Sequence, residues 1–238
     1  MMHMIKKYNP LVVGCGNIGS KFDENSNIIK NFKTHIGSYC NHKSFFKPTC
    51  VDTNEIRLKE SANFWKIKNS FASLNSIDKK QLFDVVSICT PTKNHVNDIF
   101  SVLRFKPKLI FCEKPISYNL EESRKIIKLL KSEKIKLCIN YSRRWDILIE
   151  NLKKEISTQK YGDFLTAQCI YNRGLYNNGS HLIDLLLNLF GNLNITYVGK
   201  SFNYFSKVDP TVAFNLETEN NIPIVVNTLP SNLKKDLL

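Results

Sequence analysis

Apolar and polar positions follow a repeated strand–helix pattern over the first part of the chain. Short apolar runs bounded by Gly, Pro or polar residues predict strands. Between the later runs, as in residues 92–105, apolar side chains recur at helical spacing. Alternation of this kind is typical of a parallel sheet with right-handed crossovers. The predicted strands cover residues 9–16, 47–54, 83–91, 107–115 and 135–141.

The clearest helix covers residues 119–134. Asn119 can cap its first turn, and Glu122 completes a capping box three residues later. Ile126 and Leu130 supply an apolar face, and lysines gather near the C-terminal end, where the helix dipole favours them. The segment therefore predicts an amphipathic helix that packs on the sheet.

The pattern changes in the second part of the chain. Helical spacing at residues 145–156 is followed by alternating apolar positions at 162–174 and by a leucine-rich helix at 180–191. Further strands are predicted at residues 194–205, 211–219 and 222–230. We therefore expect two domains: a parallel α/β domain over residues 1–138, and an α+β domain with a mainly antiparallel, open sheet over residues 139–238.

Composition narrows the class of protein. The chain has 238 residues, of which 42% are hydrophobic, as in globular proteins with a sizeable core. No apolar run reaches the roughly 18 residues that cross a bilayer, and no signal-peptide pattern follows the basic N-terminus. The seven cysteines include no C-x-x-C pair, so no metal site is expected, and they suit small buried hydrophobes. We expect a cytoplasmic protein.

The formal net charge is +13. Lysine is spread along the chain, with no block of like charges and no basic stripe interleaved with aromatic residues. This distribution argues against nucleic acid as the partner, although a nucleic-acid-binding protein stays an alternative. A phosphorylated or nucleotide-linked small substrate would also use the charge.

Three glycines follow the first predicted strand. Gly14, Gly16 and Gly19 form G-x-G-x-x-G between a strand and a helix start. In a Rossmann fold such glycines make a tight turn, let a pyrophosphate approach the backbone, and let helix and strand pack closely. The helix N-terminus then offers N–H groups to the phosphates. The motif predicts dinucleotide binding in this context.

Asp52, at the end of the second predicted strand, is the candidate ribose-binding acid. It lies much further along the chain than the usual spacing of about 20 residues. We infer a loop inserted after the first helical turn, with the helix resuming near residues 34–42. Asp52 would favour NAD over NADP, because its charge repels a 2′-phosphate, while the nearby Arg57 weakens that preference. An exposed turn acid is the alternative for Asp52.

Four further motifs follow in order: "CTPTKNH" at 89–95, "CEKPIS" at 112–117, "NYSRRW" at 140–145 and "GLYNNGSHLIDLLLNLFG" at 174–191. Together with the glycine loop they resemble the Gfo/Idh/MocA oxidoreductases. The resemblance implies a doubly wound Rossmann domain, then an open-sheet domain that often forms the subunit interface, and so a homo-oligomer. It implies NAD or NADP as cofactor and hydride transfer to or from a sugar-like hydroxyl.

The resemblance also implies roles for single residues. Lys114 lies beside nicotinamide and substrate, in a dipeptide with Pro115 whose bond is often cis, and His181 is the general acid/base. Asp184 orients His181 or pairs locally, and His95 borders the cofactor or caps a helix. Candidate substrate ligands are Arg143, Arg144, Asn177 and His181. Candidate cofactor contacts are Gly14, Gly16, Asn17, Ile18, Gly19, Asp52, Thr90, Pro91, His95, Glu113 and Lys114.

The sequence departs from the family pattern at two places. Asn177 stands where many members have an aspartate, and an amide can hydrogen-bond a substrate but cannot take up a proton. The strands after residue 230 that members usually carry are missing, so we expect a short sheet with an edge that needs cover.

The function predicted is an NAD(P)-dependent oxidoreductase of a sugar-like substrate, such as a nucleotide sugar in surface-polysaccharide synthesis. The alternative is a catalytically impaired cofactor-binding or assembly protein of the same fold.

Overall fold

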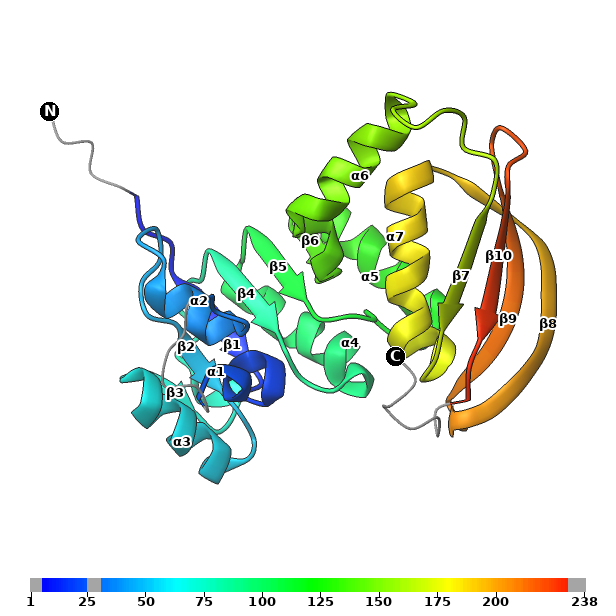
Figure 1. Cartoon of the computed structure of the whole chain (residues 1–238). Helices are drawn as coiled ribbons and strands as arrows, with labels where there is room; N and C mark the ends of the chain where they lie inside the picture. The colour runs from blue at the N-terminus through cyan, green and yellow to red at the C-terminus, as the bar shows by residue number, and fades with distance from the viewer. Residues whose placement is uncertain (1–5, 25–30, 231–238) are drawn as a thin grey trace, which may run out of the picture. The chain divides into compact units, whose positions relative to one another are not determined.

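The computed structural model describes residues 6–24 and 31–230 (Figure 1). The chain divides into two compact units, residues 1–140 and 141–238, which are taken in turn. The resemblance to a Rossmann domain followed by a mainly antiparallel open sheet is confirmed for the described residues.

Within the described residues, the first unit contains a six-stranded parallel sheet with strand order β3-β2-β1-β4-β5-β6. The chain moves outward from β1 to β3 and then returns to β4 on the other side of β1. Loops that follow β1 and β4 therefore leave in opposite directions, which opens a crevice at the carboxyl edge of the sheet. The strands are Pro10–Val13, Thr49–Val51, Ser70–Phe71, Val85–Ile88, Leu109–Cys112 and Lys136–Ile139 for β1 to β6.

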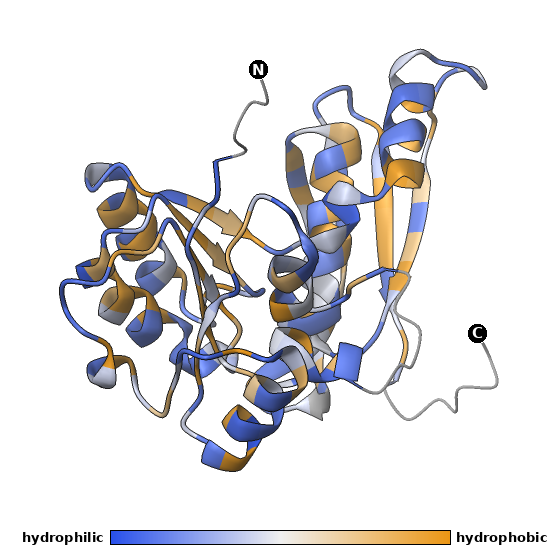
Figure 2. Cartoon of the chain, turned by 90° about the vertical axis from the view of Figure 1, so that its left-hand side faces the viewer, coloured by the Kyte–Doolittle hydropathy of each residue, from blue (hydrophilic) through white to orange (hydrophobic). Residues whose placement is uncertain are grey.

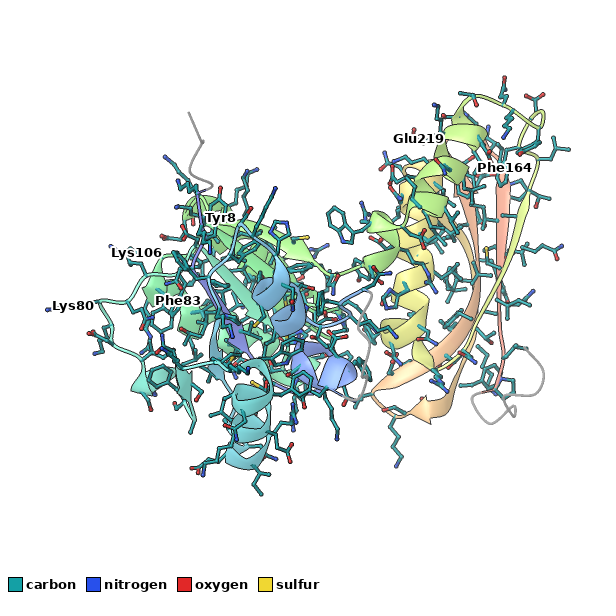
Figure 3. The ribbon with its side chains drawn as sticks, turned by 60° about the vertical axis from the view of Figure 1, so that its left-hand side comes forward. Tyr8, Lys80, Phe83, Lys106, Phe164 and Glu219 are labelled. Atoms are coloured by element: carbon teal, nitrogen blue, oxygen red, sulfur yellow. The ribbon has the colours of Figure 1, made fainter. Side chains whose placement is uncertain are left out.

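Helices pack on both faces of this sheet. Val12 belongs to a different core cluster from its neighbours Leu11 and Val13, so β1 is buried on both sides. Phe83 and Phe105 meet edge-on at 5.3 Å between ring centroids, whereas exposed lysines point outward (Figure 3). The helices are α1 Phe22–Glu24, α2 His35–Asn41, α3 Glu55–Trp65, α4 Thr92–Val102 and α5 Leu120–Ser132.

The helix predicted to resume near residues 34–42 is confirmed, while residues 25–30 of the inserted segment lie outside the described residues. A wide π-helical turn at Asn17–Lys21 and α1 follow the glycine loop, and the chain resumes as a helix at α2. Buried Asp23 accepts hydrogen bonds from the backbone N–H of Lys33 at 3.0 Å and of Thr34 at 2.8 Å. Thr34 in turn caps α2. The acid therefore fixes the backbone directly before α2.

Helix α3 and strand β3 were not predicted. The buried side of α3 consists of Leu58, Ser61, Ala62 and Trp65, which gives a weak apolar stripe. Asn54 caps it by accepting from the backbone N–H of Arg57. Strand β3 has two residues, too few for a visible alternation.

The second unit holds, in its described part, a four-stranded sheet with order β7-β10-β9-β8. Strands β7 and β10 are parallel and the other pairs are antiparallel. Helix α7 and the inner sheet face form one core, which includes Leu186, Phe214 and Val226 (Figure 2). The elements are α6 Ile147–Ser157, β7 Ala167–Tyr171, α7 Ser180–Phe190, β8 Leu193–Ser206, β9 Asp209–Thr218 and β10 Pro223–Thr228.

The seven cysteines all lie in the described ranges and form no disulfide with one another. Burial raises the pKa of the Cys40 thiol to about 11, while Cys15, Cys50 and Cys89 lie in the core. No helix in the ranges 6–24 and 31–230 is both long and apolar enough to pass through a bilayer.

Candidate functional site

The glycine loop joins β1 to the first helical turn. Gly14 has φ +97°, and a Cβ there would lie 2.8 Å from the Cys89 carbonyl carbon. A Cβ on Gly19 would overlap the carbonyl oxygen of Gly14. A Cβ on Gly16, by contrast, would have no atom within 4 Å. Two glycines therefore permit close packing, and the third leaves open space above the loop, as a bound pyrophosphate requires.

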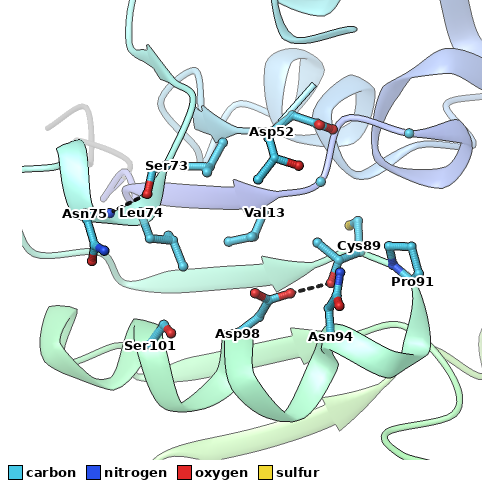
Figure 4. A pocket seen from close by; sticks show the side chains of 15 residues that line it. Val13, Asp52, Ser73, Leu74, Asn75, Cys89, Pro91, Asn94, Asp98 and Ser101 are labelled. Carbon is cyan, nitrogen blue, oxygen red and sulfur yellow. Dashed lines mark hydrogen bonds between the residues drawn. The ribbon is translucent and has the colours of Figure 1, made fainter. Parts of the chain in front are cut away.

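A cavity of about 330 Å³ opens at the carboxyl ends of β1, β2 and β4 (Figure 4). Asp52 and Ser73 lie on one side of it, and Asn94, Asp98 and Ser101 of α4 lie on the other. This is the crevice in which open parallel sheets bind ligands. The full lining is Val13, Gly14, Gly16, Val51, Asp52, Thr53, Ser73, Leu74, Asn75, Cys89, Thr90, Pro91, Asn94, Asp98 and Ser101.

Asp52 links β2 to the glycine loop. Its carboxylate accepts from the N–H of Cys15 at 2.7 Å and from the N–H of Asn54 at 2.8 Å. The two oxygens carry about four lone-pair positions, so the carboxylate retains capacity for ribose hydroxyls. Asp52 reaches the loop despite the long spacing because β1 and β2 are adjacent strands, with Val13 opposite Val51.

Arg57 of α3 supports the same loop. Its Nε donates to the carbonyl oxygen of Cys15 at 2.7 Å, and its guanidinium pairs with Glu24 and Glu60. Burial disfavours the charge, but the bonds to Glu24 and Glu60 outweigh it and raise the pKa of Arg57 above its ordinary value. The Arg57 charge, which was expected to weaken the preference for NAD over NADP, is thus paired with two carboxylates.

Thr90 and Asp98 form the α4 side of the cavity. The hydroxyl of Thr90 donates to Asp98 at 2.5 Å. Burial raises the pKa of Asp98 above its ordinary value, against the lowering effect of this bond. Asn94, Asp98 and Ser101 recur at helical spacing, a polar face that the sequence analysis did not single out.

His95 does not have the capping role that was one of the two expectations for it, and its place beside the cofactor stays a prediction. It is buried, and its ring nitrogens lie 2.7 Å from the Thr90 carbonyl oxygen and 2.8 Å from that of Pro115. An N-cap side chain accepts from backbone N–H groups, so the capping alternative is wrong. His95 instead joins the loop after β4 to the loop after β5.

Glu113 and Lys114 follow β5. The Lys114–Pro115 peptide bond is cis, as the resemblance implies. The Glu113 carboxylate accepts from Asn140 Nδ2 at 2.6 Å and lies 2.9 Å from His35 Nε2. Burial opposes ionisation of Glu113, but the bonds from His35 and Asn140, with the charge of Lys114, hold its pKa below the ordinary value.

The cavity brings together some of the predicted cofactor contacts. Among the described residues that line it, Gly14, Gly16, Asp52, Thr90 and Pro91 were predicted, whereas Ser73 and Asn75 come from a stretch where no element was expected. Predicted contacts outside the lining are Asn17, Ile18, Gly19, His95, Glu113 and Lys114.

In the second unit, Asp209 fixes the turn that carries Asn177. Its buried carboxylate accepts from the N–H of Tyr176 at 2.7 Å and of Asn177 at 3.0 Å. Gly174 has φ +84°, and a Cβ there would overlap the Asp209 carboxyl. This local pairing, which the sequence analysis missed, sets the backbone just before α7.

His181 lies in the first turn of α7. Its ring is edge-on to Tyr141, with centroids 5.7 Å apart, and burial raises the pKa of Tyr141 above its ordinary value. His181 and Arg143 line a cavity of about 350 Å³ in this unit. Its lining is Arg143, Ile170, Tyr171, Asn172, Asn178, His181, Leu182 and Leu185.

Arg144 and Asp184 form a bidentate pair. Arg144 Nε lies 2.9 and 2.8 Å from the two carboxylate oxygens, and a second guanidinium nitrogen lies 2.8 Å from one of them. Asp184 therefore pairs with Arg144, which lies 40 residues earlier in the chain. That Asp184 orients His181 stays a prediction. Arg143, the neighbouring arginine, is the one that lines the cavity with His181.

A family model described as "Oxidoreductase family, NAD-binding Rossmann fold" matches residues 8–141, more than half of the chain. The chain belongs to the Gfo/Idh/MocA family. The matched segment of this Gfo/Idh/MocA protein includes the glycine loop, Asp52 and Lys114. The resemblance drawn from the motifs is therefore confirmed.

Two curated relatives of this Gfo/Idh/MocA protein are inositol dehydrogenases. Inositol 2-dehydrogenase of Rhizobium meliloti is 33% identical over 91 residues, which cover 38% of this chain and 27% of the relative. Myo-inositol 2-dehydrogenase of Thermotoga maritima is 25% identical over 151 residues, which cover 63% of this chain and 41% of the relative. The chain thus spans less than half the length of these two relatives.

Solved structures share the fold. The WlbA dehydrogenase from Bordetella pertussis, in complex with NADH and UDP-GlcNAcA, has a TM-score of 0.78 and 18% identity over 96% of this chain and 73% of that chain. The scyllo-inositol dehydrogenase from Lactobacillus casei, with NAD(H) and scyllo-inositol, has a TM-score of 0.73 and 17% identity, over 94% and 71%. At such identities the likeness concerns the fold alone.

Proposed function

We propose that this protein binds a nicotinamide dinucleotide and transfers hydride between it and a hydroxyl or ketone of a sugar-like substrate. The observation that supports this most directly is the open space over Gly16, which borders a polar cavity that also contains Asp52. A bound pyrophosphate and ribose need those two features. The nicotinamide, when bound, supplies or accepts the hydride.

We propose NAD(H) as the preferred cofactor. The Asp52 carboxylate would accept ribose hydroxyls and repel a 2′-phosphate. Arg57 does not relieve that repulsion, because Glu24 and Glu60 already pair with its guanidinium. The electrostatics of the chain's own residues therefore favour NAD(H) over NADP(H).

Lys114 and His181 are the proposed catalytic residues. The Lys114 ammonium would donate hydrogen bonds to the reacting oxygen and polarise it. His181 would take up the proton that leaves an oxidised hydroxyl, because imidazole titrates near neutral pH. Asn177 would hydrogen-bond the substrate without exchanging a proton.

The substrate class follows from the relatives and from the cavity around His181. The named relatives include inositol dehydrogenases, and a structural neighbour holds a UDP-linked sugar acid. Arg143, Asn172 and Asn178 line the cavity and offer donors and acceptors for several hydroxyls or a carboxylate. We propose a polyhydroxylated ring, free or nucleotide-linked, as the substrate of the second unit.

The proposal is tested by cofactor titration and by turnover. Calorimetry with NAD, NADH, NADP and NADPH should detect binding, tightest for NAD or NADH; no binding of any of the four would refute the proposal. Turnover is then measured on a panel of inositols and UDP-linked sugars. Lys114→Ala and His181→Ala should each lower kcat by about a hundredfold or more and leave cofactor affinity nearly unchanged. The exposed Lys125→Ala and His42→Ala serve as matched controls.

A second candidate is a cofactor-binding protein without turnover. Asn177 favours it, because an amide stands where many members have an aspartate, and no carboxylate relay can form there. This candidate predicts NADH binding but no conversion of any substrate in the panel. Asn177→Asp would then raise turnover from background, whereas in an active enzyme it would change an existing rate.

We also propose that the second unit associates with a second copy through the open face of its sheet. Ile170 and Tyr197 are exposed apolar residues, and the strand register places both on the face opposite α7. Exposed apolar sheet faces of this kind are typical of subunit interfaces.

A further inference from the structure

A chain of polar side chains runs through the first unit beneath the carboxyl ends of β4 and β5. Tyr39 Oη lies 2.9 Å from Ser87 Oγ, and Ser87 Oγ lies 2.9 Å from His35 Nδ1. His35 Nε2 lies 2.9 Å from Glu113 Oε1. The His35 side chain is 4% exposed and that of Glu113 13%. Burying polar groups costs free energy unless they are hydrogen-bonded, so a buried network of this size calls for a functional explanation.

The chemistry of the groups gives each bond a direction. An ionised carboxylate can only accept, so the hydrogen between His35 and Glu113 lies on Nε2. With neutral imidazole, Nδ1 then accepts from the Ser87 hydroxyl, and Ser87 accepts from Tyr39. Burial raises the pKa of Tyr39 to about 12, so its hydroxyl stays protonated and can start the chain of donors.

The network ends at the residue next to Lys114. Asn140 supplies the second donor to Glu113, at 2.6 Å from the same carboxylate oxygen. The backbone N–H of Glu113 also donates to the carbonyl oxygen of Ile88 at 2.9 Å. Side chain and backbone of Glu113 are thus both held, and Lys114 follows directly on this fixed point.

The inserted segment supplies His35. The residue begins α2, directly after the Thr34 cap that Asp23 binds. The buried carboxylate of Asp23 therefore holds the Thr34 cap, and the cap places the His35 imidazole beneath β5.

We propose that His35 is a positioning residue that acts through Glu113. It holds the Glu113 carboxylate ionised and in place, and this fixed negative charge keeps Lys114 as an ammonium at the end of β5. The inference rests on the proposed function only in assigning Lys114 to the substrate. The contacts from His35 to Glu113 stand without it.

The test measures the reactivity of Lys114 in the protein without cofactor. Sulfo-N-hydroxysuccinimide acetate acylates neutral amines, and a chymotryptic peptide reports the rate at Lys114 by mass spectrometry. His35→Leu removes both ring bonds, and Glu113→Gln removes the charge. Each should speed acylation of Lys114 by about threefold or more at constant pH, because an opposite charge favours the unreactive ammonium. Other lysines, such as Lys125, should label at the wild-type rate.

Two matched variants separate positioning from packing. His35→Gln keeps an amide donor for Glu113 and should restore a near wild-type rate at Lys114. Tyr39→Phe removes a hydroxyl of the same network but not the bond to Glu113, and should leave the rate unchanged. Circular dichroism establishes that each variant is folded.

The outcomes decide the inference in either direction. Wild-type rates at Lys114 in folded His35→Leu and Glu113→Gln would overturn it, as would a His35→Gln rate equal to that of His35→Leu. Should His35→Leu not fold, a wild-type rate at Lys114 in folded Glu113→Gln would still overturn the inference, because His35 is proposed to act through that carboxylate. Titration of the wild type with NADH is separate: absence of binding would count against the proposed function, while the labelling rates still decide the role of His35.

Discussion

Gly16 and Gly19 belong to the same loop, yet a side chain would meet different surroundings at the two positions. At Gly19 it would overlap the Gly14 carbonyl oxygen, and at Gly16 it would enter open space. Gly19 is therefore needed for folding, whereas Gly16 leaves room for a ligand. The identical residue type in the sequence hides this difference.

Gly16→Val should block the cofactor and spare the fold. The added side chain has no atom to displace within 4 Å of its Cβ, so stability should change by less than about 1 kcal/mol. NADH affinity should fall about tenfold or more, because the branched side chain fills the space over the loop. Thermal unfolding and fluorescence titration measure both quantities. Unchanged NADH affinity would place the cofactor elsewhere.

Arg57→Ala should weaken NADH and NADPH binding by a similar factor. Arg57 supports the loop through the Cys15 carbonyl and pairs with Glu24 and Glu60, so its loss disturbs a surface common to both cofactors. The comparison is the ratio of the two dissociation constants in wild type and variant. A selective loss of NADPH binding would mean that Arg57 contacts a 2′-phosphate. Arg124→Ala, at an exposed position of α5, is the control.

At the scale of elements, two buried carboxylates fix the backbone directly before two helices. Asp23 sets the start of α2, and Asp209 sets the turn before α7. Each carboxylate satisfies backbone N–H groups that precede a helix, where no intrahelical partner exists. Loops near the candidate site thus have defined conformations because a distant acid supplies the missing acceptor.

The Glu113 network should make stability depend on pH on the acid side. The pKa of Glu113 is lower in the folded protein than the ordinary value of 4.5, so the folded state favours the ionised carboxyl. The stabilisation is complete above that ordinary value and is lost as the pH falls through the lower, folded-state pKa. The urea midpoint of the wild type should therefore decline more steeply below about pH 4.5 than that of Glu113→Gln.

The matched measurement is made at neutral pH. There Glu113→Gln should be the less stable protein, because its neutral amide binds His35 less strongly than a carboxylate does. Parallel midpoints for the two proteins over the whole acid range would contradict the assignment of this pH dependence to Glu113.

At the scale of the whole molecule, the two units use apolar side chains differently. The parallel sheet of the first unit is buried on both faces, as the two core clusters around β1 show. The sheet of the second unit has one covered face, while Ile170 and Tyr197 on the other are 62% and 57% exposed. These exposed apolar side chains support the proposed association with a second copy.

Ile170→Lys and Tyr197→Lys should each shift the protein from an oligomer toward a monomer. A buried lysine without a counter-charge is costly in an interface between copies. Size-exclusion chromatography with light scattering gives the mass of each protein. Ile56→Lys, at an exposed position of α3, should leave the wild-type mass unchanged. A monomeric wild type would rule out this use of the sheet face.

Features that depend on residues close together in the sequence were predicted, and features that depend on distant residues were not. Strands β1, β4 and β5 were found because their short apolar runs are uninterrupted or nearly so and are followed by Gly or Pro. Helix α3 was missed because its buried stripe contains Ser61 and Ala62 and few large apolar residues. The contacts of His35 were not predicted because its partners, Ser87 and Glu113, lie far along the chain.

The sequence by itself determined the alternation of strands and helices, the glycine loop and the family, because hydrophobic periodicity and glycine conformations are local properties of the chain. Only the tertiary structure decided which charges are already paired: Arg57 with Glu24, and Arg144 with Asp184. An ion pair forms where the fold brings distant segments together, and spacing along the chain carries no record of that distance.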